Sequence, residues 1–79
     1  MPELLLYTRA GCTLCDELRE AAEPIVQRHG ATIRKVDIEA DPELRRRYGR
    51  DIPVLVLGER EICRHRLDHG ALERALADG

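Results

Sequence analysis

The apolar residues of this chain fall into two patterns that alternate along its length. The run Leu4–Thr8 is almost entirely apolar and predicts a buried strand. The next segment, from about residue 13 to residue 29, predicts an amphipathic helix. Its apolar positions recur every three or four residues: Leu14, Leu18, Ala21, Ala22 and Ile25. Pro24 lies inside this segment and removes one helical N–H donor, so a kink or break is expected there.

The middle of the chain predicts a second strand and a short helix. Ala31–Ile38 is predicted to be a strand, although two adjacent charged residues blur its alternation. The sequence Asp41-Pro42-Glu43 supplies an N-cap side chain, a proline for the first helical position and an acid for the first turn. The helix that it opens should end by Gly49.

The last third predicts a hairpin followed by a helix. Val54–Leu57 is a continuous apolar strand, and a turn at residues 58–60 leads into a partner strand over Glu61–His65. Asp68 can cap a final helix. The apolar positions of that helix are Leu72, Ala75 and Leu76.

The predicted order of elements is β-α-β-α-β-β-α within a single domain, residues 1–79. A right-handed crossover makes the first two strands parallel, and a tight turn makes the last two antiparallel. The expected fold class is therefore α/β, with a four-stranded mixed sheet and helices on both faces.

The composition excludes several classes of function. The sequence carries 13 Lys and Arg against 15 Asp and Glu, so no basic surface for nucleic acid is expected. Only Tyr7 and Tyr48 are aromatic, which leaves little basis for base stacking. No apolar run approaches the ~20 residues needed to cross a bilayer, and no signal peptide is recognisable. We therefore expect a cytoplasmic monomer that binds neither nucleic acid nor membrane.

A pair of cysteines lies where the first strand passes into the first helix. In Cys12-Thr13-Leu14-Cys15 the first sulfur comes at a helix N-terminus, where unpaired N–H groups and the helix dipole favour a thiolate. The second sulfur follows one turn later and can close a short disulfide. In a reducing compartment such a motif is catalytic or metal-binding rather than a structural disulfide. The pair therefore predicts thiol–disulfide chemistry.

The chain resembles the thioredoxin superfamily and, within it, a divergent, small, bacterial-type branch of the glutaredoxins. The C-x-x-C after the first strand, Ile52-Pro53 before the third strand and the order of elements carry this resemblance, which covers essentially the whole chain. It implies that Pro53 is cis and lies against the cysteine pair. It also implies that the backbone of Ile52 offers hydrogen bonds to an extended thiol substrate.

The positions of the two cysteines then suggest their roles. Cys12, the more exposed sulfur at the start of the helix, would be the nucleophile, and Cys15 would be the resolving thiol that expels a mixed disulfide. The charges around Cys12 oppose one another. Asp16 and Glu17 disfavour its thiolate, whereas Arg9 favours it.

Part of a glutathione site is recognisable through the same resemblance. Arg9 matches a basic residue that contacts the glutathione carboxylate, and Asp68 lies near an acid that holds its amino group, with a spacing one residue longer. The predicted substrate-binding residues are Arg9, Thr13, Ile52, Pro53 and Asp68. No cofactor is expected.

Two departures from the glutaredoxin pattern weaken the expected glutathione site. Thr13-Leu14 replaces Pro-Tyr between the cysteines, and Cys63-Arg64 replaces the Gly-Gly that opens space for glutathione after the fourth strand. We therefore expect a thiol–disulfide oxidoreductase that acts on a protein thiol or disulfide and binds glutathione weakly.

Two other functions are compatible with the residues. The chain could be a thioredoxin-fold binding or redox-sensing module without turnover. It could also hold a structural zinc ion, since Cys12, Cys15, Cys63 and His65 are zinc-compatible ligands. Residues two apart on a strand are separated by about 6.6 Å, however, which suits a shared zinc ion poorly. Cys63 alone is expected to be a small buried apolar residue.

Overall fold

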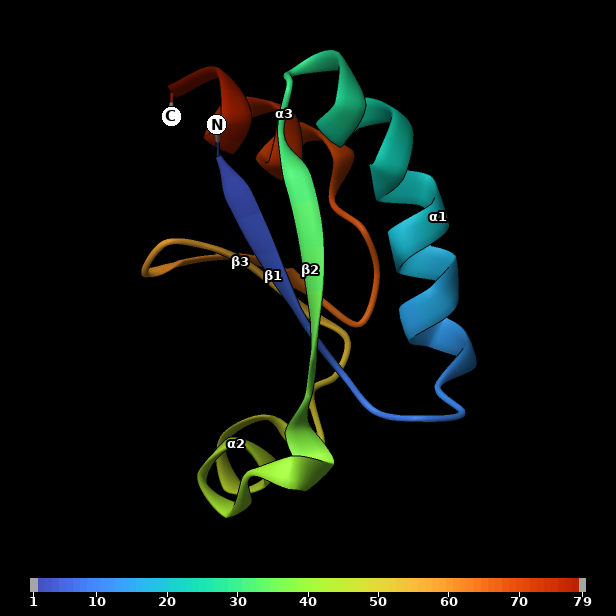
Figure 1. The fold of residues 1–79 in the computed structure, drawn as a ribbon. Helices are drawn as coiled ribbons and strands as arrows, with labels where there is room; N and C mark the ends of the chain where they lie inside the picture. Colours follow the sequence, from blue (N-terminus) through green and yellow to red (C-terminus); the bar gives the residue numbers. More distant parts are fainter. Residues whose placement is uncertain (1, 79) are drawn as a thin grey trace.

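The computed structural model describes residues 2–78, and its elements follow the predicted order with one addition, a short 3-10 helix (Figure 1). Each predicted strand and helix is present, with ends within about one residue of the expected positions. The elements are β1 (Glu3–Thr8), α1 (Thr13–Arg28), β2 (Thr32–Asp37), η1 (Ile38–Ala40), α2 (Pro42–Tyr48), β3 (Val54–Leu57), β4 (Arg60–Arg64) and α3 (His69–Asp78).

The four strands form one mixed sheet in the order β2-β1-β3-β4. β1 pairs with β2 in parallel, as the crossover through α1 requires, and β3 pairs antiparallel with both β1 and β4. The two central strands, β1 and β3, are the most continuously apolar segments of the chain. The predicted mixed four-stranded sheet is confirmed.

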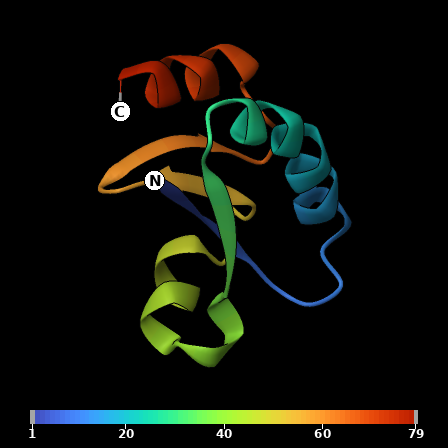
Figure 2. The same ribbon diagram turned by 45° about the horizontal axis from the view of Figure 1, so that its top comes forward.

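One face of the sheet carries the core. α1 and α3 pack over this face and against each other, as Figure 2 shows. Side chains at alternate positions of β1, Leu4 and Leu6, point toward them and are fully buried. The core is completed by Leu18, Ala22, Ile25, Val26, Ala31, Leu55, Cys63, Leu72 and Leu76.

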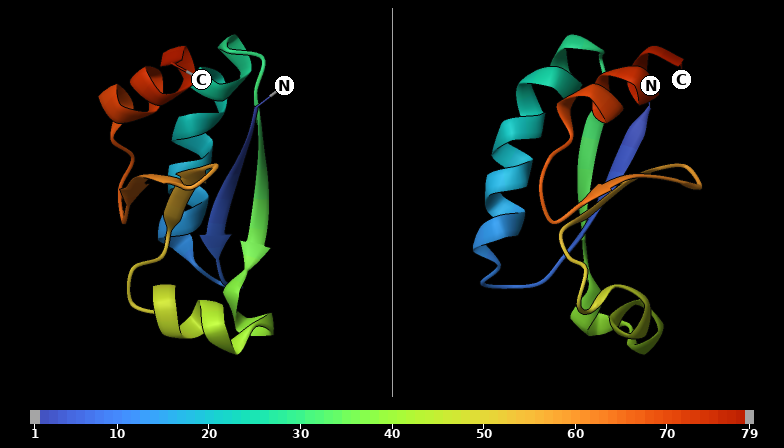
Figure 3. Two further views of the ribbon diagram at one scale, coloured as in Figure 1. Left: turned by 90° about the vertical axis from the view of Figure 1, so that its left-hand side faces the viewer. Right: turned by 180° about the vertical axis from the view of Figure 1, so that it is seen from behind.

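The opposite face is covered only at one end. α2 lies across the end of the sheet on the side away from α1, as the right-hand view of Figure 3 shows. Its contact with β1 is a stacked aromatic pair, with the rings of Tyr7 and Tyr48 4.4 Å apart and inclined by 18°. Helices therefore lie on both faces of the sheet.

The helix does not break at Pro24, contrary to one of the two outcomes expected from the sequence. α1 continues without interruption from Thr13 to Arg28. The proline removes a single hydrogen bond, whereas Ala22, Ile25 and Val26 are buried against the core on both sides of it. Tertiary packing therefore holds the helix together across the missing donor.

The 3-10 helix explains why β2 ends one residue earlier than predicted. The carboxylate of Asp37 accepts a hydrogen bond of 2.9 Å from the Glu39 N–H and so turns the chain out of the strand. Ile38, which the apolar pattern had assigned to the strand, is fully buried in η1 instead. The connection between β2 and α2 is thereby fixed.

Candidate active site

The cysteine pair lies at the turn from β1 into α1. Gly11 has a φ of +77°, a conformation that glycine adopts without strain, and it directs the chain into the helix. Cys12 is the N-cap residue, and Cys15 lies in the first turn. The two are joined by a disulfide, and their Cα atoms are 5.3 Å apart.

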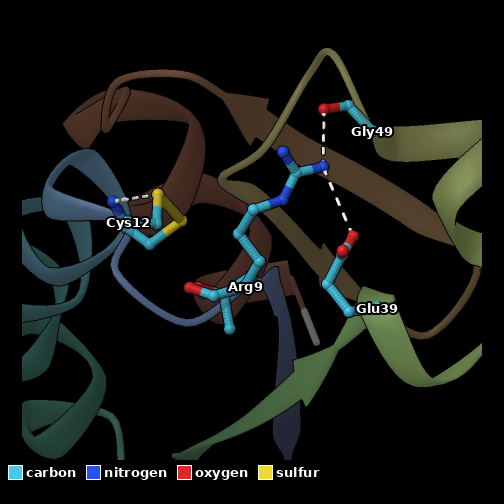
Figure 4. Close-up of a disulfide and its surroundings, with 6 residues drawn as sticks. Arg9, Cys12, Glu39 and Gly49 are labelled. Carbon is cyan, nitrogen blue, oxygen red and sulfur yellow. Dashed lines mark hydrogen bonds and ion pairs between the residues drawn. A yellow bond between two sulfur atoms is a disulfide. The ribbon is translucent and has the colours of Figure 1, made fainter.

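The environments of the two sulfurs differ. Cys15 is only 2% exposed and belongs to the buried residues of α1, whereas Cys12 is partly exposed at the surface. The Sγ atom of Cys12 also accepts a hydrogen bond of 3.1 Å from the N–H of Cys15, drawn in Figure 4. An N–H donor at a helix start favours an anionic sulfur. The geometry therefore makes Cys12 the accessible sulfur and Cys15 the protected one.

Arg9 points away from the sulfurs and into the opposite side of the site (Figure 4). Its Nη2 donates to the Gly49 carbonyl over 3.0 Å and lies 3.7 Å from the Glu39 carboxylate. Its Nε is buried and has no hydrogen-bond partner among residues 2–78. Arg9 therefore ties the loop before the cysteines to the end of α2, and Glu39 offsets its charge. Its predicted contact with a substrate carboxylate remains a prediction.

The segment before β3 carries two further predicted binding residues, Ile52 and Pro53. The Ile52–Pro53 peptide bond is cis, and Pro53 is fully buried. The Ile52 N–H donates to the Tyr48 carbonyl over 3.1 Å, while the Pro53 carbonyl accepts from the His65 N–H over 2.8 Å. The Ile52 N–H is therefore already bonded within the protein, and a contact between the Ile52 backbone and a substrate stays a prediction.

The segment that replaces Gly-Gly lies at the end of β4. Cys63 points into the core and is 9% exposed, as expected for a small apolar residue. Arg64 instead forms an ion pair of 2.9 Å with Asp51, next to the cis peptide bond, and a second with Glu61. The hydrogen bonds from Arg64 lower the pKa of the Glu61 carboxyl. Arg64 therefore bridges a region that would be bare backbone in the glutaredoxin pattern, whereas the Cys63 side chain turns away from it.

The chain turns sharply immediately after this segment. His65 has a φ of +68°, a left-handed conformation that is uncommon for a residue other than glycine. The sequence does not indicate this turn, because position 65 is a histidine rather than a glycine. The family resemblance places its glycine positions one and two residues earlier. The side chain of His65 is half exposed and lies 3.8 Å from the Asp51 carboxylate.

The two remaining predicted binding residues lie at helix starts. Asp68 precedes α3, and its Oδ1 accepts a hydrogen bond of 3.0 Å from the Ala71 N–H, which confirms its capping role. Thr13 is the exposed first residue of α1. Whether either residue contacts a substrate remains a prediction.

The zinc alternative finds no support in the geometry. Within residues 2–78, no three of the His, Cys, Asp and Glu side chains come together in a way that could hold a metal ion. The four zinc-compatible residues of the sequence are divided by the fold, since Cys63 is buried in the core and His65 turns toward Asp51.

The buried third cysteine should react slowly. Burial raises the pKa of the Cys63 thiol, and the nearby charges of Asp68 and Glu61 add to this, against an opposing hydrogen bond from the Asp68 backbone. We expect iodoacetamide at neutral pH to label Cys63 far more slowly in the folded, reduced protein than in urea, as measured by mass spectrometry of peptides. Labelling at equal rates in both conditions would contradict this placement.

The fold and the cysteine pair together define a thioredoxin-fold protein of the glutaredoxin type. Residues 3–77 match the family model described as glutaredoxin-like domain (DUF836), and the chain belongs to this family. No helix within the described residues is long and apolar enough to cross a membrane.

Related proteins occur in several organisms. The chain is 31% identical over 72 residues to the "Glutaredoxin-like protein YDR286C homolog" of Dictyostelium discoideum, a match covering 84% of this chain and 67% of that protein. It is 28% identical over 81 residues to the uncharacterized protein Rv0508 of Mycobacterium tuberculosis, covering 96% of this chain and 84% of that one.

Two solved structures support the fold. The solution structure of protein Ne2328 from Nitrosomonas europaea superposes with a TM-score of 0.85 at 25% identity, covering 94% of this chain and 89% of that one. The X-ray structure of protein XcR50 from X. campestris gives a TM-score of 0.71 at 35% identity, and the match covers 96% of this chain and 97% of that one. These likenesses confirm the thioredoxin-like α/β fold.

Proposed function

We propose that this protein is a thiol–disulfide oxidoreductase in which Cys12 and Cys15 alternate between dithiol and disulfide. The observation that carries the proposal is the pairing of an accessible sulfur at the N-cap of α1 with a buried sulfur one turn later. Membership of the glutaredoxin-like family supports it. The proposal includes a reducing compartment such as the cytoplasm, because a catalytic dithiol must be returned to its reduced form.

The reaction begins at Cys12. Its thiolate attacks one sulfur of a substrate disulfide, the substrate S–S bond breaks, and the other substrate sulfur leaves as a thiolate that takes up a proton from solvent. The N–H groups at the start of α1 favour the attacking thiolate before this step. The product is a mixed disulfide between Cys12 and the substrate.

Cys15 completes the reaction. Its thiolate attacks the Sγ of Cys12, the mixed disulfide breaks, and the second substrate sulfur leaves and is protonated. The substrate has then gained two electrons and two protons, and the protein holds the Cys12–Cys15 disulfide. An external dithiol or protein thiol donor regenerates the reduced pair by the same exchange in the opposite direction.

The surroundings of the pair favour a protein or dithiol donor over glutathione. Arg64 bridges to Asp51 where the family resemblance calls for open glycine backbone. Arg9, the residue expected to receive a glutathione carboxylate, is bonded to Gly49. A small ligand needs a shaped floor as well as groups that hold its ends. We therefore propose that glutathione is a weak partner.

A comparison of electron donors tests the donor preference. We expect reduction of a protein disulfide to proceed at least about tenfold faster, per catalytic centre, with dithiothreitol or with thioredoxin and its reductase than with glutathione and glutathione reductase. A tenfold difference corresponds to about 1.4 kcal/mol, the order expected from losing one well-placed contact. NADPH consumption measures the two coupled systems, and insulin precipitation measures the dithiothreitol reaction.

The same experiment separates the alternatives. Efficient turnover at millimolar glutathione alone would show that the substituted segment still forms a working glutathione site. Absence of turnover with every donor, together with a disulfide that forms and is reduced normally, would instead favour a redox-sensing module. The Cys12→Ser variant provides the background rate for each donor.

A further inference from the structure

An exposed leucine lies between the two cysteines. Leu14 is 50% exposed, and within residues 2–78 it is the large apolar side chain that the fold leaves open to solvent. Keeping such a side chain in water forgoes the stabilisation that its burial would bring. Its position next to the reactive sulfurs makes it a natural contact for whatever binds there.

Leu14 borders a cleft between α1 and the connection from β4 to α3. In Figure 1 this connection, in orange, runs beside the N-terminal half of α1. The cleft has a volume of about 270 Å³ and is lined by Leu14, Glu17, Leu18, Ala21, His65, Arg66 and Leu67. Ligand pockets usually enclose about 300–1,000 Å³, so the cleft suits a side chain with its adjoining backbone rather than a larger compound.

The walls of the cleft carry two exposed charges of opposite sign. Glu17 lies on the α1 wall and Arg66 on the loop wall. Neither takes part in any ion pair found between residues 2 and 78. An extended polypeptide has backbone N–H groups that can donate to the Glu17 carboxylate and C=O groups that can accept from the Arg66 guanidinium. The apolar floor and the two polar walls are thus complementary to a peptide segment with an aliphatic side chain.

We infer that this cleft is a docking subsite for the partner protein, and that it receives an aliphatic side chain within a few residues of the partner's reactive cysteine. The inference rests on the proposed function, since the partner is held at Cys12 as a mixed disulfide while the cleft is filled. Continuity with the cysteine pair supports it, because Leu14 borders the cleft and His65 donates to the Pro53 carbonyl. Glutathione lacks an aliphatic side chain for this subsite.

Cysteine peptides capped with thionitrobenzoate test the inference. Attack of Cys12 on the peptide sulfur releases coloured thionitrobenzoate, so the second-order rate constant is read directly. Each test peptide has one leucine at one of the four positions that flank the cysteine, two before it and two after it. The reference peptide is otherwise identical and has serine at all four positions. We expect at least one leucine placement to react about tenfold faster than the serine peptide, as burial of one aliphatic side chain allows.

A matched pair of variants locates the effect. Ala21→Gln places a polar side chain in the cleft six residues beyond Cys15, and Ala77→Gln makes the same change at an exposed alanine of α3 that does not line it. Both substitutions cost little helix propensity. We expect Ala21→Gln to reduce the leucine preference below about threefold, and Ala77→Gln to keep it.

The outcomes distinguish failure of the docking subsite from failure of the proposed oxidoreductase function. Equal rates for leucine and serine peptides in the unaltered protein, or a preference that survives Ala21→Gln, would overturn the docking subsite alone. Ellman's reagent, which has no peptide side chain, should react equally with the unaltered protein and both variants. If the reduced protein reacts through Cys12 with neither the peptides nor Ellman's reagent, the proposed oxidoreductase function fails as well.

Discussion

Replacing Cys12 with serine should abolish disulfide reduction, whereas replacing Cys15 with serine should stop the reaction at a mixed disulfide. Cys12 is the accessible sulfur at the helix start, so its loss removes the attacking group. Cys15 is 2% exposed, and in the proposed mechanism it resolves the intermediate, so its loss should leave the first step intact and the second impossible. Turnover assays and mass spectrometry of the Cys15→Ser variant with bound substrate measure the two effects.

Cys63→Ser is the matched control, since it removes a cysteine that is free and buried in the structure. This variant should keep reductase activity. Limiting alkylation of the reduced protein should label Cys12 before Cys15. Faster labelling of Cys15, or a mixed disulfide that accumulates in Cys12→Ser instead, would reverse the assigned order of attack.

The largest expected effect on stability comes from the centre of the sheet. Leu55 of β3 is fully buried and lies opposite Leu6 of β1. We expect Leu55→Ala to lower the free energy of unfolding by about 2–5 kcal/mol, because the truncated side chain leaves a cavity in the core. A domain of this size has a total stability of only about 4–12 kcal/mol, so much of it would be lost.

Leu14→Ala is the matched control for this prediction. It removes the same atoms from a side chain that is 50% exposed, so the free energy of unfolding should change by no more than about 0.5 kcal/mol. Urea unfolding followed by circular dichroism measures both variants. A loss below about 1 kcal/mol for Leu55→Ala would show that β3 is not at the centre of the core.

Most of the fold could be predicted because its signals are local in sequence. The apolar runs of β1 and β3, the helical spacing in α1 and the capping sequence before α2 each report on a few neighbouring residues. The cysteine pair is equally local, because four consecutive residues place both sulfurs on one helical turn. Pro24 is the exception, since packing on both sides of it outweighs a local preference.

The parts of the site that escaped prediction depend on residues far apart in the sequence. Arg9 meets Gly49, 40 positions later, and no pattern around either residue indicates this hydrogen bond. The left-handed turn at His65 lacks the glycine that would have revealed it. The cleft under Leu14 needs α1 and the β4–α3 connection to be placed side by side. Such features follow from tertiary packing rather than from local pattern.

A redox titration tests the central claim most directly. The protein is equilibrated in dithiothreitol buffers of graded potential, the free thiols are alkylated, and the linked peptides are identified by mass spectrometry. We predict one reversible two-electron transition in which Cys12 and Cys15 form the disulfide while Cys63 stays free. A dominant link through Cys63, or a Cys12–Cys15 pair that does not change state reversibly, would contradict the proposed dithiol mechanism.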